Sequence, residues 1–299
     1  MAILHPELIS PPELPAPVYK AIGAAALLAN WIRKNWLGYR RARGFSPSEI
    51  DRALAHVRRG VTEWLGYLDD YSNGQFVLDR RRILELGPGP DLGVGALLLS
   101  KGAAQYTALD VNRLLDDTPA GFYERLFADQ SIAPVRGDVE AALRGQPSRL
   151  RYVCDRDFDP RVAVPDGVDL VLSQAAFEHF DNVPTLFAQL NEVLAPGAWL
   201  CAQIDLETHV EWLRRRDPLN IYRFSKTTYR SFHYPGAPNR LRPRDYVNML
   251  ERAGWRDVRV YSMKQLAPAY LARIGRSLAQ EFRGGDMDLL GVMILARHP

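Results

Sequence analysis

The stretch Ile83-Leu84-Glu85-Leu86-Gly87-Pro88-Gly89-Pro90-Asp91-Leu92-Gly93 decides the fold of this chain of 299 residues. It begins as an apolar run that carries one acidic residue, and it then breaks into a loop rich in glycine and proline. Residues 94–99 are apolar again and have the composition of the first turns of a helix. A strand, a turn of small residues and a helix in this order are typical of a nucleotide-type site, because glycine lets the backbone approach a ligand and the N-terminus of the helix faces it.

The composition favours a cytoplasmic protein without a membrane span. Hydrophobic residues make up 47% of the chain, enough for the core of one large domain, and the net charge of +3 neither demands nor excludes an anionic partner. Cys154 and Cys201 lie in separate apolar runs without a C-x-x-C spacing, which favours buried thiols in a reducing compartment. Residues 1–20 lack the basic start of a signal peptide, and the most apolar run, residues 21–32, is shorter than the ~20 residues of a membrane span.

Residues 1–80 are expected to form a helical N-terminal extension or cap. Five prolines within residues 1–17 predict an extended arm. A helical pattern follows over residues 18–43, and the capping sequence Ser46-Pro47-Ser48-Glu49 starts a second helix that runs to about Tyr71. Basic residues in the first helix are interpreted as a solvated face, with an anion-binding or membrane-surface patch as the alternative. These residues are Arg33, Lys34, Arg40, Arg41 and Arg43.

Residues 81–299 alternate strands with helices, which predicts a mostly parallel sheet of the α/β class. Residues 112–148 are expected to be an insertion between the second and third strands. Residues 206–244 show no clean periodicity and are interpreted as a lid or substrate insertion. The expected helices include residues 183–194, 243–253 and 267–282, and the seven expected strands lie at residues 83–86, 106–110, 150–155, 168–173, 198–204, 255–261 and 289–295.

The glycine turn favours S-adenosylmethionine (SAM) over a dinucleotide. A dinucleotide turn of the form G-x-G-x-x-G that begins at Gly87 would place its third glycine at Leu92, which disfavours an NAD enzyme. SAM has no pyrophosphate and requires an acid before the turn, glycine backbone beside its amino-acid part, and an acid on its ribose. The residues that match are Glu85 before the turn, Gly87, Pro88 and Gly89 in the turn, and Asp110, followed by Val111, after the second strand.

A further acid is expected at the adenine amine. Asp155 follows the third strand and lies 14 residues before Asp169, which is an ordinary loop length. Asp138 is the alternative, but it lies about 30 residues before the fourth strand, too far for an ordinary loop. Asp155 is therefore the preferred candidate.

The segments ILELGPGPDLG, YTALD, YVCD, VDLVLSQAAFEHF and LNEVLAPGAWLCAQIDL together resemble class I SAM-dependent methyltransferases. They are most similar to a bacterial small-molecule branch with a G-x-G-x-x-L-G turn and an SQxxxEH segment, and the resemblance covers roughly residues 80–299. It implies a doubly wound, Rossmann-like sheet of seven strands, the last of them antiparallel beside the sixth. It also implies that Ser173 and Gln174 lie beside the methionine part of SAM. The chain departs from the commoner pattern at Asp91, where a third glycine is usual.

Methyl transfer depends on holding the acceptor close to the methyl group, and a base is needed only when the acceptor must lose a proton. Acceptor residues are expected where strands four and five end. After strand four, Phe177 could shield the cofactor, while Glu178 and His179 are catalytic candidates that could instead stabilise the start of a helix. After strand five, His209 is the preferred base, with a role in anchoring the lid as the alternative.

Two further expectations concern metal and acceptor. Asp205, Glu207 and His209 are metal-ligand residue types, but no metal-type spacing fixes them, so no metal site is predicted. The lid is rich in arginine and aromatic residues, and a guanidinium suits carboxylate or phosphate. An acceptor with an anionic group, such as an acidic or nucleotide-linked sugar, is therefore expected, with Tyr222, Arg223 and Arg240 as its candidate ligands.

Two rival functions stay open. The basic N-terminal helix would suit methylation of nucleic acid, but Ser173-Gln174-Ala175-Ala176 replaces the [DNS]-P-P-aromatic segment of enzymes that methylate exocyclic base nitrogens. The other rival is a SAM-binding or partner-binding subunit without turnover, since function depends on the site rather than the fold. The expected partner is thus a small-molecule acceptor rather than nucleic acid, and the N-terminal helices could cap the pocket or form a homodimer surface.

Overall fold

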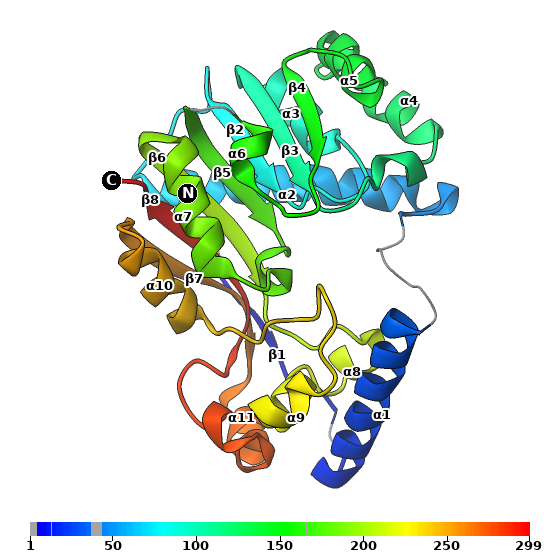
Figure 1. Ribbon diagram of the computed structural model, residues 1–299, viewed down its shortest axis with the longest axis vertical. Helices are drawn as coiled ribbons and strands as arrows, with labels where there is room; N and C mark the ends of the chain where they lie inside the picture. The colour runs from blue at the N-terminus through cyan, green and yellow to red at the C-terminus, as the bar shows by residue number, and fades with distance from the viewer. Residues whose placement is uncertain (1–4, 13, 37–43, 165–166) are drawn as a thin grey trace.

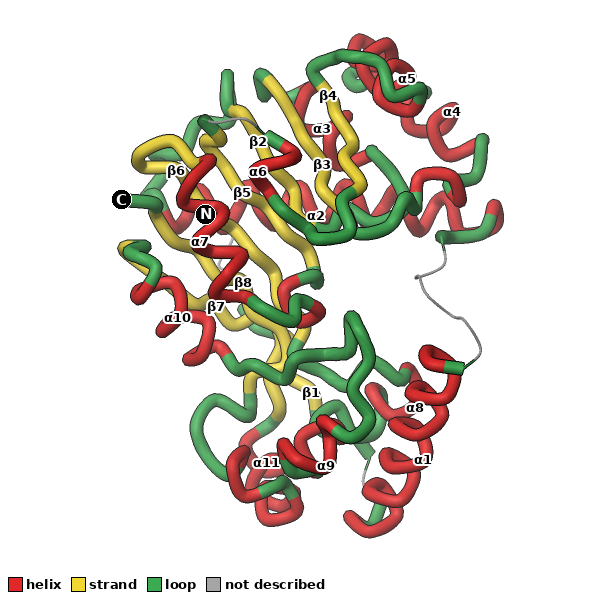
Figure 2. The backbone as a smooth tube through the Cα atoms, viewed as in Figure 1, coloured by secondary structure: helices red, strands yellow, loops and turns green. Residues whose placement is uncertain are grey.

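A computed structural model describes residues 5–12, 14–36, 44–164 and 167–299. Its strands form one mostly parallel sheet with helices on both faces (Figures 1 and 2). The strand order across the sheet is β1-β7-β8-β6-β5-β2-β3-β4. The strands are β1 (Glu7–Ile9), β2 (Arg82–Leu86), β3 (Gln105–Asp110), β4 (Leu150–Cys154), β5 (Val168–Gln174), β6 (Leu194–Asp205), β7 (Arg256–Leu266) and β8 (Leu289–Arg297).

All seven expected strands are present, and the expected number of seven is wrong by one. The additional strand is β1, which pairs in parallel with the far edge of β7 through Glu7 and Lys264. Its position at the sheet edge suits the prolines around it, since proline has no N–H to donate and is tolerated mainly at sheet edges. The last strand, β8, runs antiparallel to both β6 and β7, as the methyltransferase fold implies.

The helices follow the expected alternation with small differences at their ends. Helices α7 and α10 match the predicted ranges to within about a residue, whereas the helix expected at residues 267–282 ends at Ile274 and continues as two short 3-10 turns. The helices are α1 (Ala16–Asn35), α2 (Ile50–Tyr71), α3 (Gly93–Ser100), α4 (Gly121–Phe127), α5 (Arg136–Leu143), α6 (Pro160–Ala163), α7 (Val183–Val193), α8 (Glu211–Arg214), α9 (Lys226–Arg230), α10 (Pro243–Arg252) and α11 (Pro268–Ile274).

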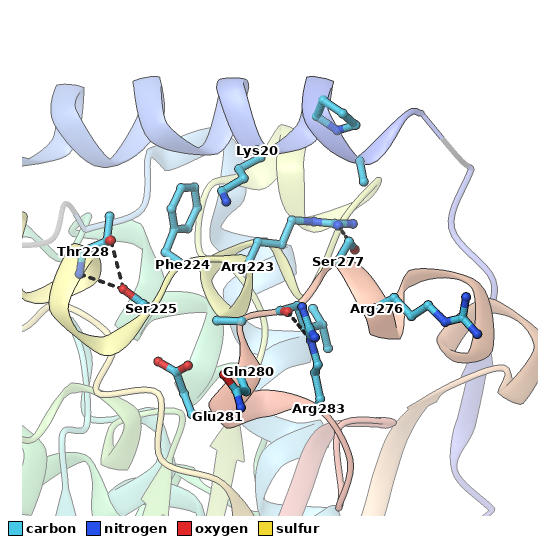
Figure 3. A pocket seen from close by; sticks show the side chains of 14 residues that line it. Lys20, Arg223, Phe224, Ser225, Thr228, Arg276, Ser277, Gln280, Glu281 and Arg283 are labelled. Atoms are coloured by element: carbon cyan, nitrogen blue, oxygen red, sulfur yellow. Dashed lines mark hydrogen bonds between the residues drawn. The ribbon is translucent and has the colours of Figure 1, made fainter.

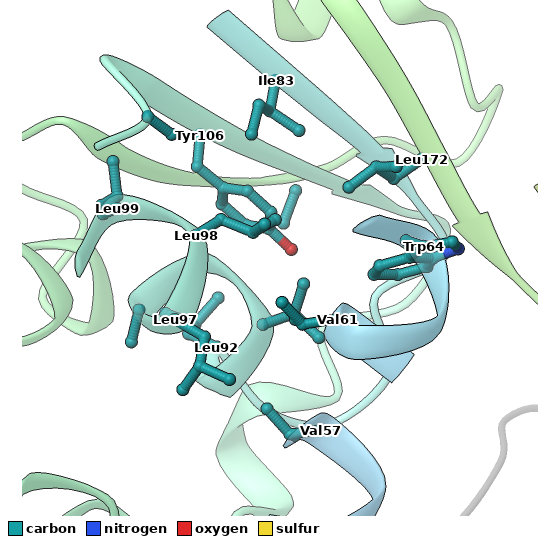
Figure 4. Close-up of a cluster of buried hydrophobic side chains, with 14 of the residues drawn as sticks. Val57, Val61, Trp64, Ile83, Leu92, Leu97, Leu98, Leu99, Tyr106 and Leu172 are labelled. Carbon is teal, nitrogen blue, oxygen red and sulfur yellow. The ribbon is translucent and has the colours of Figure 1, made fainter. Parts of the chain in front are cut away.

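Helix α2 is a layer of the main domain rather than an appended cap. Its buried residues recur at helix spacing and form one apolar stripe, which packs on α3 and the sheet (Figure 4). Trp64 and Leu68 on this stripe are almost fully buried. A boundary at residue 80 therefore does not separate a cap from the domain. The members of the stripe are Leu54, Val57, Val61, Trp64 and Leu68.

The opposite face of the sheet is covered by α6, α7 and α10, so the sheet is doubly wound. A third apolar cluster forms a second lobe from the lid residues, the end of β7 and α11. Helix α1 packs on this lobe, because Asn220 donates a hydrogen bond to the carbonyl of Tyr19 (2.9 Å). Figures 1 and 2 show α1, α8, α9 and α11 together at one end of the molecule.

Of the five basic residues expected in the first helix, Arg33 and Lys34 lie in the last turn of α1. The basic residues Arg40, Arg41 and Arg43 lie outside the described residues. Lys34, near the end of α1, places its ammonium 5.4 Å from the ring centre of Tyr234 in the lid, so this part of the helix contacts the second lobe. No helix in the described ranges has both the length and the apolar character to cross a membrane.

Candidate active site

The glycine turn after β2 contains two glycines with different roles. Gly87 and Gly89 adopt φ angles of +72° and +79°, which disfavour any residue with a Cβ. A Cβ on Gly87 would lie 2.6 Å from the Cβ of Ala176, so this glycine lets the turn pack against the loop that follows β5. A Cβ on Gly89 would have no neighbour within 4 Å among the described residues. Gly89 therefore faces space that a ligand can fill.

Asp91 caps the helix that follows the turn. Its Oδ1 accepts a hydrogen bond from the backbone N–H of Gly93 (2.8 Å), the first residue of α3. Burial raises the pKa of Asp91 to about 6, and this hydrogen bond acts in the opposite direction. A carboxylate is favourable at this end of a helix because it satisfies an unpaired N–H group. At the position where a third glycine is usual, Asp91 thus provides a side-chain acceptor for the first N–H of the helix.

Glu85 and Asp110 connect the turn to the neighbouring strand. Glu85 is buried, and its carboxylate accepts a hydrogen bond from the hydroxyl of Tyr106 on β3. Burial raises the pKa of Glu85 well above its usual range, and the nearby charges of Asp91 and Asp110 raise it further. Burial also raises the pKa of Asp110. Hydrogen bonds from the backbone N–H groups of Asn112, Gly89 and Val111 lower it in part. Asp110 ends β3, and the exposed side chain of Val111 follows it.

Asp155 lies directly beside Asp110 at the end of the neighbouring strand. Its backbone N–H donates to the carbonyl of Asp110 (2.9 Å), and its Oδ2 accepts from the N–H of Asp159 (2.9 Å). The alternative candidate, Asp138, lies on α5 and is instead paired with Arg149 (2.6 Å). Of the two acids, Asp155 is the one at the carboxyl edge of the sheet.

Ser173 and Gln174 end β5 next to the turn. The Ser173 hydroxyl is fully buried and donates to the carbonyl of Leu86 (3.0 Å), so it joins β5 to the strand that leads into the turn. The Gln174 side chain lies against α2, where a Cβ on Gly60 would be 2.8 Å from its Oε1. Sequence reasoning missed Gly60, although a glycine inside a strongly amphipathic helix is a signal of close approach.

Glu178, His179 and His209, here called the His–Glu cluster, lie together after β5 and β6. One potential ligand atom of each residue lies within 4.8 Å of those of the other two. The rings of His179 and His209 meet edge to face with their centres 4.8 Å apart, and Nε2 of His209 is 3.9 Å from Oε1 of Glu178. Because β5 and β6 are parallel neighbours, their following loops meet at one edge of the sheet.

The lid holds the His–Glu cluster in place. Nδ1 of His179 is 2.7 Å from the carbonyl of Gly236, and the N–H of Asn239 donates to the carbonyl of Glu178 (2.7 Å). Burial lowers the pKa of His179, and the nearby His209 lowers it further. Burial raises the pKa of Glu178 well above its usual range, with Asp205 as the next contributor.

Four other candidates are placed away from this cluster or inside the protein. Phe177 is buried in the core against Phe180, Phe187 and Tyr246. This packing does not support the expected role of Phe177 as a shield over the cofactor. Arg223 is buried and paired with Asp217 (2.7 Å). The remaining two are Tyr222, whose hydroxyl donates to the carbonyl of Leu206 (3.1 Å), and Arg240, which donates to the carbonyls of Ile221 and Phe224.

These partners give both guanidinium groups a role within the fold. A groove of about 660 Å³ does lie in the second lobe, between α1 and the segments around Arg223 and Ser277 (Figure 3). Within the described part of the chain, Arg223 is the one predicted site residue that lines it. Acceptor binding by Tyr222, Arg223 and Arg240 stays a prediction that this geometry does not support.

A family model described as a methyltransferase domain matches residues 28–260 of the chain. No curated protein matches it. Similar solved structures include a SAM-dependent methyltransferase from Mesorhizobium loti (16% identity, 76% of this chain and 95% of that chain covered, TM-score 0.43). Others are phosphoethanolamine N-methyltransferase 2 from Haemonchus contortus with SAM (14%, 80% and 52%, 0.45) and a SAM-dependent methyltransferase from Archaeoglobus fulgidus (14%, 90% and 99%, 0.45). At these scores the structures carry no argument about the acceptor of this chain.

Proposed function

Because this chain belongs to the methyltransferase-domain family and uses SAM as its methyl donor, we propose that its acceptor is a small molecule bound where β5 and β6 end. The observation that carries the proposal is the contact between the glycine turn and the loop after β5. Gly87 packs against Ala176, which lies two residues before Glu178 of the His–Glu cluster. A donor beside the turn and an acceptor beside the cluster would therefore be neighbours.

The proposed cofactor site follows the carboxyl edge of β2, β3, β4 and β5. Gly87, Pro88 and Gly89 present backbone and open space for the amino-acid part. The other assignments are Asp110 and Val111 at the ribose, Asp155 at the adenine amine, Ser173 and Gln174 beside the methionine part, and Glu85 as the buried acid that, with Tyr106, holds the turn. When bound, SAM supplies an electrophilic methyl group on its sulfonium. Its positive charge suits the buried carboxyl groups of this edge.

His209 is the proposed proton acceptor for a hydroxyl or ammonium acceptor. Its Nδ1 is 3.0 Å from the carbonyl of Glu207, which can only accept a hydrogen bond, so the proton of the neutral ring is on Nδ1. Nε2 is then left with a lone pair and lies 3.9 Å from Oε1 of Glu178. His179 and Glu178 line the same position and would orient the acceptor, which is where a methyltransferase obtains much of its rate.

The proposal is tested by supplying the purified chain with SAM and an extract of the source cells. Mass spectrometry then identifies small molecules that gain the mass of one CH2 group. The expected result is one such product, formed by the native chain and not by His209→Gln, while both bind S-adenosylhomocysteine equally in calorimetry. Tight cofactor binding without any methylated small molecule would contradict the proposal and favour the subunit without turnover. Methylated nucleic acid in the same extract would favour the other rival.

A further inference from the structure

The His–Glu cluster combines two imidazoles and one carboxylate at the carboxyl edge of the sheet. One ligand atom of each residue lies within 4.8 Å of those of the other two. We propose that Glu178, His179 and His209 bind a divalent transition-metal ion. The inference rests on the proposed function and deepens it, because the ion would lie beside the acceptor and bind one of its oxygens. It does not follow from any spacing in the sequence, since 29 residues that include β6 separate His179 from His209.

Both imidazoles have Nδ1 beside a backbone carbonyl, which leaves Nε2 available to a metal. Nδ1 of His179 is 2.7 Å from the carbonyl of Gly236, and Nδ1 of His209 is 3.0 Å from the carbonyl of Glu207. A carbonyl accepts and never donates, so each neutral ring carries its proton on Nδ1 and a lone pair on Nε2. Histidines that bind metals almost always donate their other N–H to a carbonyl, carboxylate or water in this way.

Glu178 supplies a second, independent observation. Its side chain is only 4% exposed, and neither carboxylate oxygen has a hydrogen-bond partner in the described structure. The backbone N–H groups of Glu178 and Asp205 favour the charged form of this carboxylate, but neither forms a hydrogen bond of ordinary length and angle with it. A buried carboxylate without a partner is costly, so a group with unfilled acceptor positions beside two imidazoles indicates a missing cation.

The neighbouring acids already have cations of their own. Arg214 pairs with Asp205 (2.6 Å) and with Glu207 (3.0 Å), and Lys264 also pairs with Glu207 (2.7 Å). Glu178 is therefore the acid of this region that has no cationic side chain in direct contact among those the structure describes. Arg214 is held away from it by its two other partners. A bound divalent ion would compensate the charge of the Glu178 carboxylate.

The donor set selects the class of ion. Two nitrogens and one oxygen suit Zn²⁺, Co²⁺, Fe²⁺ or Mn²⁺, whereas Mg²⁺ and Ca²⁺ prefer oxygen ligands throughout. Ligand atoms about 2.1 Å from an ion lie roughly 3–3.4 Å apart, so the longest separation in the cluster must shorten by about 1.5 Å. His209 can make this movement because it is the most exposed of the three and lies on a loop. Three protein ligands leave a coordination position open for the acceptor.

The open position gives the ion a role in the proposed function. A hydroxyl or carboxylate oxygen of the acceptor bound to the ion is held in place, and a bound hydroxyl becomes more acidic. The lone pair on Nε2 of His209 cannot bind the ion and take a proton at the same time. In the metal-bound protein, His209 would therefore act as a ligand, and the proton of the bound, more acidic hydroxyl would pass to solvent water.

The test uses the full chain without an affinity tag, stripped with a chelator and then titrated with Zn²⁺ or Co²⁺. Calorimetry gives the stoichiometry and affinity, and the visible absorption of Co²⁺ reports nitrogen and oxygen coordination. We expect one ion per chain, bound by the native protein. Glu178→Gln, His179→Gln and His209→Gln should each weaken binding by more than about 100-fold, the upper end of the loss seen for residues that only support a ligand.

The matched control is His233→Gln, which removes an exposed histidine paired with Asp181 (3.2 Å) and should leave metal binding unchanged. Each variant is also titrated with S-adenosylhomocysteine and unfolded thermally, which separates loss of the metal site from loss of the fold. Glu178 is buried and His209 is partly exposed. If Glu178→Gln fails to fold, metal binding by His209→Gln still tests the site. Absence of stoichiometric binding by the native chain, or equal binding by the variants and the control, would overturn the inference.

The failure of this inference is distinguishable from failure of the proposed function. A chain that binds S-adenosylhomocysteine and methylates a small molecule equally well with and without a chelator keeps the proposed function and loses the metal site. If Glu178 binds the ammonium of an acceptor amine instead, turnover is chelator-resistant and is lost in Glu178→Gln. Metal binding by the cluster without any methyl transfer supports the site and removes the proposed function.

Discussion

Tyr106 on β3 donates its hydroxyl hydrogen bond to the carboxylate of Glu85 on β2, and both side chains lie inside the core. Glu85 is thus an internal support of the glycine turn, because it is the last residue but one of the strand that leads into Gly87. Its raised pKa has burial as the main cause and the neighbouring acids Asp91 and Asp110 as the next. The Tyr106 ring also packs against Gly95 at the start of α3. One tyrosine therefore links strand, turn and helix.

Tyr106→Phe should lower the free energy of unfolding by about 1–3 kcal/mol, because it leaves a buried carboxyl group without its donor. Urea unfolding measures the change. Tyr71→Phe is the matched control, since its hydroxyl donates to the backbone carbonyl of Asp257 (2.8 Å) and should cost about 1 kcal/mol. Glu85→Gln combined with Tyr106→Phe should cost less than the sum of the two single changes. A Tyr106→Phe cost no larger than that of the control would contradict the assignment.

Gly89→Ala should weaken the binding of S-adenosylhomocysteine by at least about tenfold, which is about 1.4 kcal/mol. The added methyl group would enter the open space in front of the turn. Its strained backbone costs about 1–2 kcal/mol of stability. Calorimetry and thermal unfolding separate the two effects.

Two other glycines serve as controls for Gly89. Gly254→Ala carries a similar backbone strain (φ +90°) with no described neighbour within 4 Å of its Cβ, and it should reduce stability without changing cofactor affinity. Gly87→Ala should be the least stable of the three, because its Cβ overlaps Ala176. Equal cofactor affinity in the Gly89 and Gly254 variants would place the cofactor elsewhere.

The sheet was predictable because its information is local. Each strand is a short apolar run, and parallel neighbours bring their carboxyl ends to one edge, so the order of Glu85, Asp110 and Asp155 along the chain already predicts a common edge. The exception is β1, which has three residues beside prolines and is specified by pairing with β7 instead of by its own pattern. The apolar spacing of α2 in the sequence is also evidence that this helix packs in the core, beyond the prediction that it is a helix.

The site was less predictable because its side chains are paired over long distances. Arginine flanked by apolar residues predicts an anionic acceptor, but the same pattern describes a buried guanidinium with an internal acid. Asp217, six residues before Arg223, was the signal for the second interpretation. The contact of His179 with His209 requires two loops to meet, and the lid residue Gly236 then fixes the first of them. No linear spacing encodes that arrangement.

Asp91→Asn should make the protein more stable above pH 6 and leave it nearly unchanged at pH 4. The folded state raises the pKa of Asp91 from 3.8 to about 6, so it retains a proton that the unfolded chain releases in this range. That contribution to stability is present below pH 4 and is lost as the pH rises through about 6, by at most about 3 kcal/mol. Asparagine does not titrate and can still accept the hydrogen bond from Gly93.

The pH effect is measured as the difference between the unfolding free energies of native protein and variant from pH 4 to pH 7.5. Other acids titrate in both proteins and largely cancel in the difference. Asp116→Asn, at an exposed acid near Arg113, is the control and should change stability by less than about 0.5 kcal/mol at any pH. A difference for Asp91→Asn that does not grow between pH 4 and pH 6 would show that the carboxylate is hydrated in the folded protein.

Asp217→Asn should destabilise the protein by about 3–5 kcal/mol, because it leaves the guanidinium of Arg223 buried without its counter-ion. The pair has two hydrogen bonds, of 2.7 and 3.0 Å, and its side chains are at most 1% exposed. Asp217 also accepts from Asn220, which binds the backbone of α1, so limited proteolysis should cut the variant near α1 more readily. Arg223→Gln should behave alike, and Arg230→Gln, at an exposed arginine of α9, should be neutral in urea unfolding. An Arg223→Gln protein with unchanged unfolding but a raised KM for its acceptor would instead establish Arg223 as an acceptor ligand.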